Sequence, residues 1–240
     1  MQKTGTLYGV GVGPGDPELL TMKAWRLIRQ APVVSYLCND SGESQARQIA
    51  AVVLSEAEPG AFELPLPMPM SRDRTAANAA YDEGAARIAE QLRQGHDVVF
   101  LCEGDPLFFG SFAYLLDRLQ DQFPCEVVPG ISSVNAAASA LCSPLTLLTE
   151  SFVVVSGRHT DEQIIQALQT HQSVVIMKAG QARARILALL EHTSRIGEAR
   201  YLEYIGRDNQ RIVEDVRRLS AEAGPYFSLF VVLPARVSRP

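Results

Sequence analysis

The chain has 240 residues, of which 47% are hydrophobic and 20% charged, and its formal net charge is −5. This length suits one large domain or two of about 120 residues, and the negative charge argues against a nucleic-acid binder, which presents a basic face. No apolar run approaches the roughly 18 residues of a membrane span, and the N-terminus lacks an apolar signal segment, so we expect a cytoplasmic protein without a membrane partner.

Strand-like runs alternate with helical patterns along the chain, which predicts an α/β fold with mainly parallel sheets. The run 98–102 is apolar at every position, as in a strand buried on both faces. The expected strands are 6–12, 32–37, 97–102, 125–128, 152–156, 173–177, 200–204 and 227–233. The expected helices are 17–30, 43–56, 75–94, 110–122, 160–170, 179–192 and 208–218.

Two breaks interrupt the alternation. The proline-rich stretch 65–70 is predicted to be a loop, because proline lacks a backbone donor and restricts the residue before it. A second break near 142–151 precedes a fresh start of strand and helix. We therefore expect an N-terminal α/β domain over 1–128, a linker and helix over 129–150, and a C-terminal α/β domain over 151–240.

The first strand runs into a glycine-rich turn, Gly9-Val-Gly-Val-Gly-Pro-Gly15, and then into a helix that Asp16 and Pro17 are suited to begin. The dinucleotide fingerprint with glycines at i, i+2 and i+5 fails in every register, and no Gly-Lys-Ser/Thr triplet of a phosphate-binding loop is present. Carboxylates at 16 and 18 would also repel a pyrophosphate. The turn favours a ligand without phosphates at the carboxyl end of a strand, or a tight turn with no ligand.

Three further strand-to-helix turns follow this one. Gly104-Asp105-Pro106 repeats the earlier Gly-Asp-Pro, and Asp105 either accepts hydrogen bonds from a ligand hydroxyl or amine or only caps its helix. In the third turn, 128–133, Ser132 or Ser133 could cap a helix whose N–H groups would face a carboxylate. In the fourth, Met177 is either a core residue or a ligand contact.

Metal chemistry has little support in the sequence. There is no CxxC pair, and the histidines show no metal-ligand spacing, so we expect no metal and mostly buried free thiols. The residues concerned are Cys38, Cys102, Cys125, Cys142, His96, His159, His171 and His192.

These four turns, in this order, resemble the tetrapyrrole methylase family, the class III S-adenosylmethionine-dependent methyltransferases. The matching segments are 11–21, 103–111, 128–133 and 176–178, so the resemblance covers essentially the whole chain. It implies two α/β domains with the cofactor cleft between them, usually in a homodimer. Many relatives carry Gly-Gly-Asp where this chain has Glu103-Gly104-Asp105. The implied S-adenosylmethionine contacts are Pro14, Glu103, Gly104, Asp105, Phe108, Ser132, Ser133, Met177, Tyr204 and Ile205.

Within the family the chain is most similar to the subgroup that methylates precorrin-2 at C20, giving precorrin-3A in cobalamin biosynthesis. The resemblance implies direct attack by an electron-rich carbon, with positioning as the main source of acceleration. The substrate's carboxylates call for cations, for which Arg72 and Arg74 are the first candidates, followed by Arg158 and Lys178. The sequence identifies no catalytic residue; Tyr36, Asp40 and Glu150 are candidates for a general base.

Other functions remain open. The acceptor could be another corrinoid position or a cobalt-containing factor II, because the acceptor pocket lies in variable loops. A more distant alternative is diphthine synthase, which shares the cofactor site but modifies a protein. A non-catalytic binding protein is disfavoured by the intact glycine turns and both Asp-Pro elements, and a nicotinamide oxidoreductase by the failed fingerprint.

Overall fold

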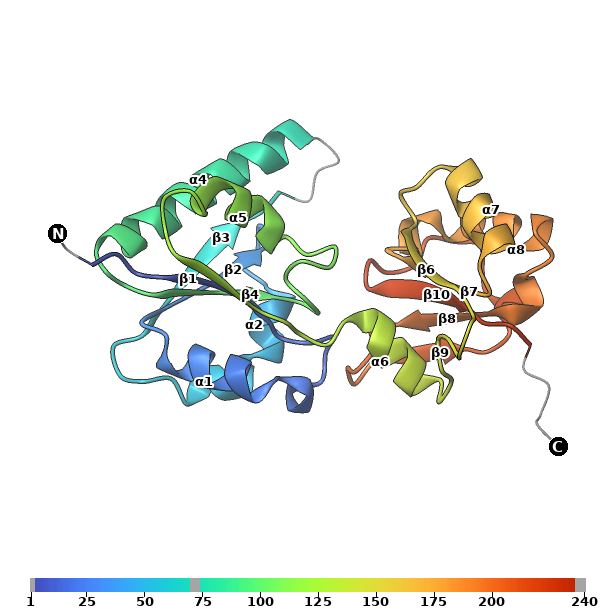
Figure 1. Cartoon of the computed structure of the whole chain (residues 1–240), viewed down its shortest axis with the longest axis horizontal. Coiled ribbons are helices and arrows are strands. Elements are labelled where there is room, and N and C mark those ends of the chain that lie inside the picture. Colours follow the sequence, from blue (N-terminus) through green and yellow to red (C-terminus); the bar gives the residue numbers. More distant parts are fainter. Residues whose placement is uncertain (1–2, 70–73, 236–240) are drawn as a thin grey trace. The chain divides into compact units, whose positions relative to one another are not determined.

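The computed structural model describes residues 3–69 and 74–235. The chain divides into two compact units, Met1–Ser133 and Val134–Pro240. Each unit carries its own five-stranded sheet, covered by helices (Figure 1). The α/β class predicted from the alternation of strands and helices is therefore confirmed.

In the first unit every strand pair is parallel, and the strand order is β3-β2-β4-β1-β5. The central strand, β4, is buried at all of its five residues, as its uninterrupted apolar sequence predicts. The strands are β1 (Leu7–Gly11), β2 (Val33–Cys38), β3 (Phe62–Pro67), β4 (Val98–Cys102) and β5 (Cys125–Val128).

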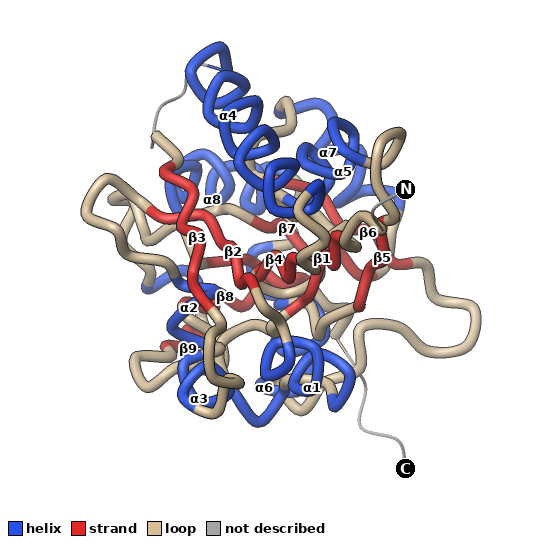
Figure 2. Tube along the Cα trace, turned by 90° about the vertical axis from the view of Figure 1, so that its left-hand side faces the viewer, coloured by secondary structure: helices blue, strands red, loops and turns tan. Residues whose placement is uncertain are grey.

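Helices cover both faces of this sheet (Figure 2). On one face α4 (Arg74–Arg93) and α5 (Phe112–Leu119) pack around Phe100 and Leu7. On the other face α1 (Met22–Gln30), α2 (Gln45–Ile49) and α3 (Ala51–Ser55) pack around Val10 and Leu101. The single helix expected over 43–56 is thus two short helices with Ala50 between them.

The proline-rich stretch contradicts the prediction of a loop, because its first part forms strand β3. This strand is the edge of the sheet and pairs only with β2 among the described strands. The N–H groups of Phe62 and Met68 donate to the carbonyl oxygens of Pro32 and Cys38, so the backbone N–H groups of the even-numbered residues point toward β2. Pro65 and Pro67 occupy the odd positions that face the open edge, where a proline removes no ladder bond.

The second unit has the strand order β6-β7-β10-β8-β9. Only β6 and β7 pair in parallel; β10 runs antiparallel to both β7 and β8, and β9 runs antiparallel to β8. Parallel pairing therefore dominates the first sheet but not the second, which is mixed. The strands are β6 (Phe152–Ser156), β7 (Ser173–Met177), β8 (Ala199–Glu203), β9 (Arg211–Val213) and β10 (Ser228–Val232).

Helices α7 (Asp161–Thr170) and α8 (Arg183–His192) pack on one face of this sheet around Ile176 and Phe230. Helix α6 (Ser133–Ala140) packs on the other face against Val175 and Leu229. A capping box at Thr160 explains where α7 begins. Short 3-10 turns occur at Pro17–Leu19, Gly180–Ala182, Ile196–Glu198 and Val216–Arg218.

The helix expected over 208–218 is wrong. Residues 211–213 form β9 instead, and a 3-10 turn follows at 216–218. Tyr201 and Val213 are partners in the β8–β9 ladder. The β-branched Ile212 and Val213 suit this short strand, and Asp215 caps the turn after it by accepting from Arg217 N at 3.2 Å.

Candidate functional site

Three of the predicted turns meet at one edge of the first sheet. Strand β1 lies between β4 and β5, and the three strands are parallel, so the turns after them share the carboxyl edge. Helix α1, which follows β1, and helix α5, which follows β4, pack on opposite faces. The chain thus leaves two neighbouring strands in opposite directions, which is where open α/β sheets bind ligands.

The turns after β1 and β4 are joined by backbone hydrogen bonds. Gly104 N donates to Gly13 O at 2.7 Å, and Gly13 N donates to Gly104 O at 3.3 Å. Gly13 and Gly104 have φ values of +82° and +66°, a region in which side chains other than glycine are strained. The two glycines, one in each loop, therefore join the loops into one unit.

Glycine also allows the three turns to touch. A Cβ on Gly130 would lie 2.0 Å from Gly104 O and 2.8 Å from Gly11 Cα, and a Cβ on Gly11 would lie 2.6 Å from Gly130 Cα. The neighbouring atoms belong to backbone, so they cannot turn aside as a side chain would. The glycines at 11 and 130 consequently serve contact between turns.

Asp105 fastens this arrangement. Its Oδ1 accepts from Leu107 N at 2.9 Å and Phe108 N at 3.1 Å, and its Oδ2 accepts from Gly130 N at 3.1 Å. The carboxylate thus joins the turn after β4 to the turn after β5. Each carboxylate oxygen can accept more than one hydrogen bond, so these bonds are compatible with a further bond to a ligand.

The turn after β1 has the predicted cap at Asp16, but the helix expected over 17–30 is a 3-10 turn followed by α1, which has its own cap. Asp16 Oδ1 accepts from Glu18 N at 2.8 Å and begins a 3-10 turn with Pro17 at its first position. Thr21 then caps α1 itself by accepting from Ala24 N at 3.1 Å. Pro14, a predicted cofactor contact, is buried beside this turn.

Glu103 occupies a position where many relatives have glycine. Its Oε1 accepts from Ala46 N, at the start of α2, at 3.2 Å, while the residue as a whole is exposed. The carboxylate is therefore turned toward α2, and the larger residue is accommodated without displacing the turn that Gly104 and Asp105 form.

The remaining predicted contacts of this unit lie on the same two turns. Phe108 is 37% exposed and makes an edge-to-face contact with Phe109 at 5.2 Å. Phe109 has a φ of +55°. Ser132 is buried, and Ser133 is the first residue of α6. The first unit thus brings together Pro14, Glu103, Gly104, Asp105, Phe108, Ser132 and Ser133.

The charge of the three turns suits one kind of cofactor. Residues 11–16, 103–106 and 129–133 contain three carboxylates and no lysine or arginine. Such a set would repel phosphates and accommodates a cationic nucleoside. The residues present therefore fit S-adenosylmethionine, whose sulfonium and amino groups are positive.

The predicted contacts of the second unit share one edge of its sheet. Strands β7 and β8 both run antiparallel to β10, so their carboxyl ends flank its beginning. Met177 ends β7, and Tyr204 follows β8 with a φ of +51° and donates its N–H to Phe227 O at 2.9 Å. Ile205 is a core residue that packs in the same cluster as Leu202 and Val134.

The three candidates for a general base differ in their surroundings. Tyr36 is buried and donates its hydroxyl to Glu63 Oε2 at 2.6 Å; burial, and then Glu63, raise the pKa of Tyr36 to about 12. It is therefore protonated at neutral pH and unsuited to accept a proton. Asp40 is exposed, and Glu150 Oε2 accepts from Leu147 N at 2.8 Å within its own loop.

The side chains of the two arginines first predicted to bind substrate carboxylates fall outside the described part of the structure. Arg72 lies between residues 69 and 74, and Arg74 begins α4 with an undescribed side chain. Arg158 is exposed and Lys178 is half-buried. Among the cysteines, Cys38 and Cys102 are buried and burial raises the pKa of each, whereas Cys142 is exposed rather than buried.

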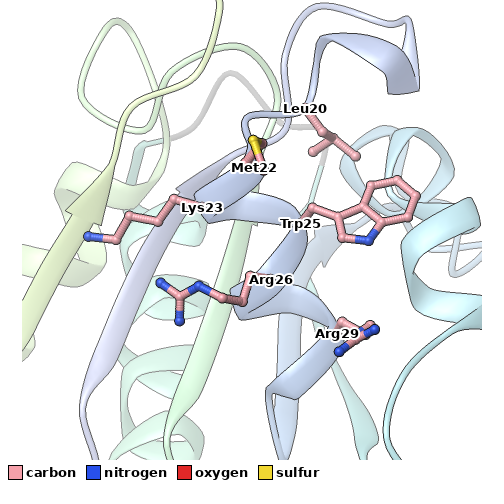
Figure 3. Close-up of a pocket in the computed structure, with 6 residues that line it drawn as sticks. All are labelled: Leu20, Met22, Lys23, Trp25, Arg26 and Arg29. Carbon is pink, nitrogen blue, oxygen red and sulfur yellow. The ribbon is translucent and has the colours of Figure 1, made fainter.

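A separate depression lies along helix α1 (Figure 3). Lys23 and Arg26 extend from one side of the helix and Trp25 from the other. Lys23 Nζ lies 3.6 Å from Glu126 Oε2. Helix α1 and Leu20, two residues before it, provide all of the lining, which contains none of the glycines of the turns: Leu20, Met22, Lys23, Trp25, Arg26 and Arg29.

The sequence analysis missed two aromatic residues, Tyr226 and Phe227, which lie directly before β10, between the carboxyl ends of β7 and β8. The predicted contacts follow strands, whereas these two residues precede β10. Two adjacent aromatic residues at the start of an apolar run are the signal that could have revealed them. Within residues 3–69 and 74–235, no helix is long and apolar enough to cross a membrane, and no group of three metal-ligating side chains occurs.

Comparison with known proteins gives a consistent result. The model of the family described as Tetrapyrrole (Corrin/Porphyrin) Methylases matches residues 6–219. A precorrin-2 C(20)-methyltransferase of Sinorhizobium sp is 35% identical over 98% of this chain and 98% of its own length. The cobalamin biosynthesis protein CobIJ of Mycobacterium bovis is 36% identical over 95% of this chain. The chain spans about half, 46%, of the length of CobIJ.

Solved structures agree on the fold. A uroporphyrin-III C-methyl transferase from Thermus thermophilus, complexed with S-adenyl homocysteine, superposes with a TM-score of 0.67. The two sequences are 28% identical, and the match covers 95% of this chain and 97% of the other.

Proposed function

Because the chain belongs to the tetrapyrrole (corrin/porphyrin) methylases, we propose that it methylates precorrin-2 at C20 with S-adenosylmethionine, forming precorrin-3A in cobalamin biosynthesis. The observation that carries this proposal is the match of 35% identity with a precorrin-2 C(20)-methyltransferase over 98% of both chains. The match extends over nearly the whole length of both proteins and is not confined to the glycine turns.

The turns of the first unit are assigned to the cofactor. Gly13 and Gly104 shape the joined loops, and Asp105 holds the turn that carries Gly130. Pre-formed loops lower the cost of ordering on binding. We also assign three residues of the second unit to the cofactor: Met177, Tyr204 and Ile205. The proposed contacts are thus Pro14, Glu103, Gly104, Asp105, Phe108, Ser132, Ser133, Met177, Tyr204 and Ile205.

The sulfonium of S-adenosylmethionine supplies an electrophilic methyl carbon. The protein's part is to hold the acceptor carbon in line with that methyl group, and positioning of this kind can supply most of the acceleration. No side chain needs to form a covalent bond with the substrate. Tyr36 is excluded as the acceptor of the C20 proton by its raised pKa of about 12.

Arg72 and Arg74 are proposed to bind substrate carboxylates. Replacing both with glutamine should raise the KM for precorrin-2 and leave the affinity for S-adenosylhomocysteine unchanged, because the cofactor turns lack any basic residue. Steady-state kinetics and calorimetry measure the two quantities. An unchanged KM would contradict the assignment.

We further propose that the protein acts in the cytoplasm as a homodimer. The homodimer is what the family resemblance implies. Sedimentation velocity at micromolar protein would test the dimer, and a single monomeric species would contradict it.

The alternative is methylation of the cobalt-containing substrate or of a different position. Incubation of the purified protein with S-adenosylmethionine and either metal-free or cobalt-loaded precorrin-2 distinguishes these, because mass spectrometry reports one added methyl group and NMR reports its carbon. Calorimetric titration with S-adenosylhomocysteine, with NADH as the control, tests the cofactor class separately. Methylation at C20 of the metal-free substrate supports the proposal; modification at another carbon overturns it.

A further inference from the structure

Beside the turns that follow β7 and β8, the second unit gathers three aromatic side chains and two cations. We call this group the edge cluster and define it as Lys178, Tyr204, Arg207, Tyr226 and Phe227. Lys178 follows β7, Tyr204 and Arg207 follow β8, and the last two precede β10. Three segments distant in sequence thus meet at one edge of the sheet (Figure 1).

Contacts between rings and charges connect the members of the edge cluster. The Arg207 guanidinium lies 4.2 Å from the centre of the Phe227 ring and 5.8 Å from that of Tyr204. Lys178 Nζ lies 5.8 Å from the centre of the Tyr226 ring. The rings of Tyr226 and Phe227 meet edge to face at 5.2 Å. Each cation is therefore held against an aromatic face.

Two strained backbone positions lie at the same place. Lys178 and Tyr204 have φ values of +54° and +51°, although neither is a glycine. Residues in this conformation occur where the surroundings enforce it, and they gather at functional sites. Here Ala179 N donates to Ser228 O at 3.3 Å and Tyr204 N to Phe227 O at 2.9 Å. Both strained turns are thus tied to the segment that carries the aromatic residues.

The chemistry of the edge cluster points to a flat, polyanionic ligand. Aromatic faces bind flat conjugated or apolar rings, and a stacked guanidinium keeps its N–H edge oriented for a carboxylate. Two neighbouring cations favour an anionic ligand group beside them. The local charge is also opposite to the chain's net charge of −5.

We propose that Lys178 and Arg207 bind peripheral carboxylates of the tetrapyrrole, with Tyr226 and Phe227 providing the surface on which its ring system lies. The proposal rests on the proposed function for the class of substrate. It assigns acceptor specificity to the second unit, at the edge that also carries Met177 and Tyr204.

The test measures binding of stable porphyrins to the full chain, which requires no turnover. The probes are uroporphyrin III, an octacarboxylate, and coproporphyrin III, a tetracarboxylate with the same macrocycle. Arg207→Gln and Lys178→Gln should each weaken uroporphyrin binding by roughly ten- to a hundredfold, the loss expected for one charge-assisted hydrogen bond, and weaken coproporphyrin binding less. Arg207→Lys should restore part of the affinity, because it retains the charge but not the planar fork.

Arg217→Gln is the matched control. Arg217 is an exposed arginine of the same unit that pairs with Asp215 at 2.7 Å, so its loss changes the net charge equally without touching the edge cluster. Tyr226→Leu adds a second readout, since it should weaken both porphyrins by a similar factor. S-adenosylhomocysteine affinity and thermal midpoint should be unchanged in the charge variants.

The outcomes separate clearly. Porphyrin affinities of Arg207→Gln and Lys178→Gln that equal those of Arg217→Gln overturn the proposal, as does the absence of porphyrin binding by the unaltered protein. A loss confined to S-adenosylhomocysteine affinity also overturns it and assigns the edge cluster to the cofactor. If the unaltered protein fails to methylate precorrin-2 yet binds uroporphyrin in an Arg207-dependent way, the proposed function fails and the carboxylate assignment stands.

Discussion

Replacing Gly130 by alanine tests whether contact between the three turns builds the cofactor site. The new Cβ would lie 2.0 Å from Gly104 O, whereas ordinary contacts begin near 3.4 Å, so the backbones must separate by about 1.4 Å. Gly11 Cα, at 2.8 Å, prevents retreat toward the turn after β1. Overpacking of this kind costs about 1–3 kcal/mol, and we expect the upper part of that range because backbone must move.

The separation should also pull Asp105 away from Gly130 N, a hydrogen bond of 3.1 Å. We therefore expect a thermal midpoint lower by several degrees together with S-adenosylhomocysteine affinity reduced by more than about tenfold. Differential scanning fluorimetry and calorimetric titration measure these two effects. Gly197→Ala is the control, because a Cβ there has nothing within 4 Å. A Gly130→Ala protein that matches Gly197→Ala in both measurements would refute the reasoning.

Three further substitutions test other parts of the structure. Asp105→Asn should destabilise the protein by about 1–3 kcal/mol, because the amide has one accepting oxygen where the carboxylate has two. Thermal unfolding measures this loss, and no change would mean that the three N–H groups find other acceptors. Arg183→Met should lower the thermal midpoint of the second unit, because the buried Glu203 carboxylate loses its partner 3.5 Å away and keeps only the exposed Arg211 among its described ion-pair partners, at 3.7 Å. The cost should lie below the about 3–5 kcal/mol of a buried charge left unpaired, and a neutral effect would refute an intact buried pair. Glu63→Gln should lower the stability of the protein at neutral pH but not in acid. Arg47, through its hydrogen bonds, lowers the pKa of Glu63, so the carboxylate's contribution is present above its unfolded pKa near 4.5 and is lost as pH falls through the lower folded value. Urea unfolding at several pH values tests this; a gap between the two proteins that persists below the folded pKa would contradict it.

Local patterns predicted what short-range chemistry decides. The cap at Asp16, the buried strand β4 and the order of the turns can be read from consecutive residues. Strand β3 was mispredicted because a proline's missing donor disrupts a sheet only where another strand lies on that side. Which strand forms the edge of the sheet depends on the fold of the whole unit. Likewise 211–213 forms a strand only because β8 is there to pair with it.

The site was predictable in its chemistry but not in its internal contacts. The lack of basic residues in the turns can be read from the sequence, and it excludes phosphate-bearing cofactors. The contact of Gly11 with Gly130 depends on the order of β4, β1 and β5, which no spacing encodes. The sequence analysis named Lys178 and Tyr204 of the edge cluster but not Tyr226 and Phe227, because antiparallel β10 brings residues 226 and 227 to a position that a parallel strand would not.

The prolines of β3 constrain how copies of this protein can associate. An open strand edge is a template for another strand, and proteins protect such edges to prevent unwanted assembly. Pro65 and Pro67 remove two adjacent outward donors from the exposed side of β3, so a second sheet cannot continue the hydrogen-bonded ladder there. A homodimer of this chain must therefore be held by side-chain packing or by a different edge, and the first sheet ends at β3.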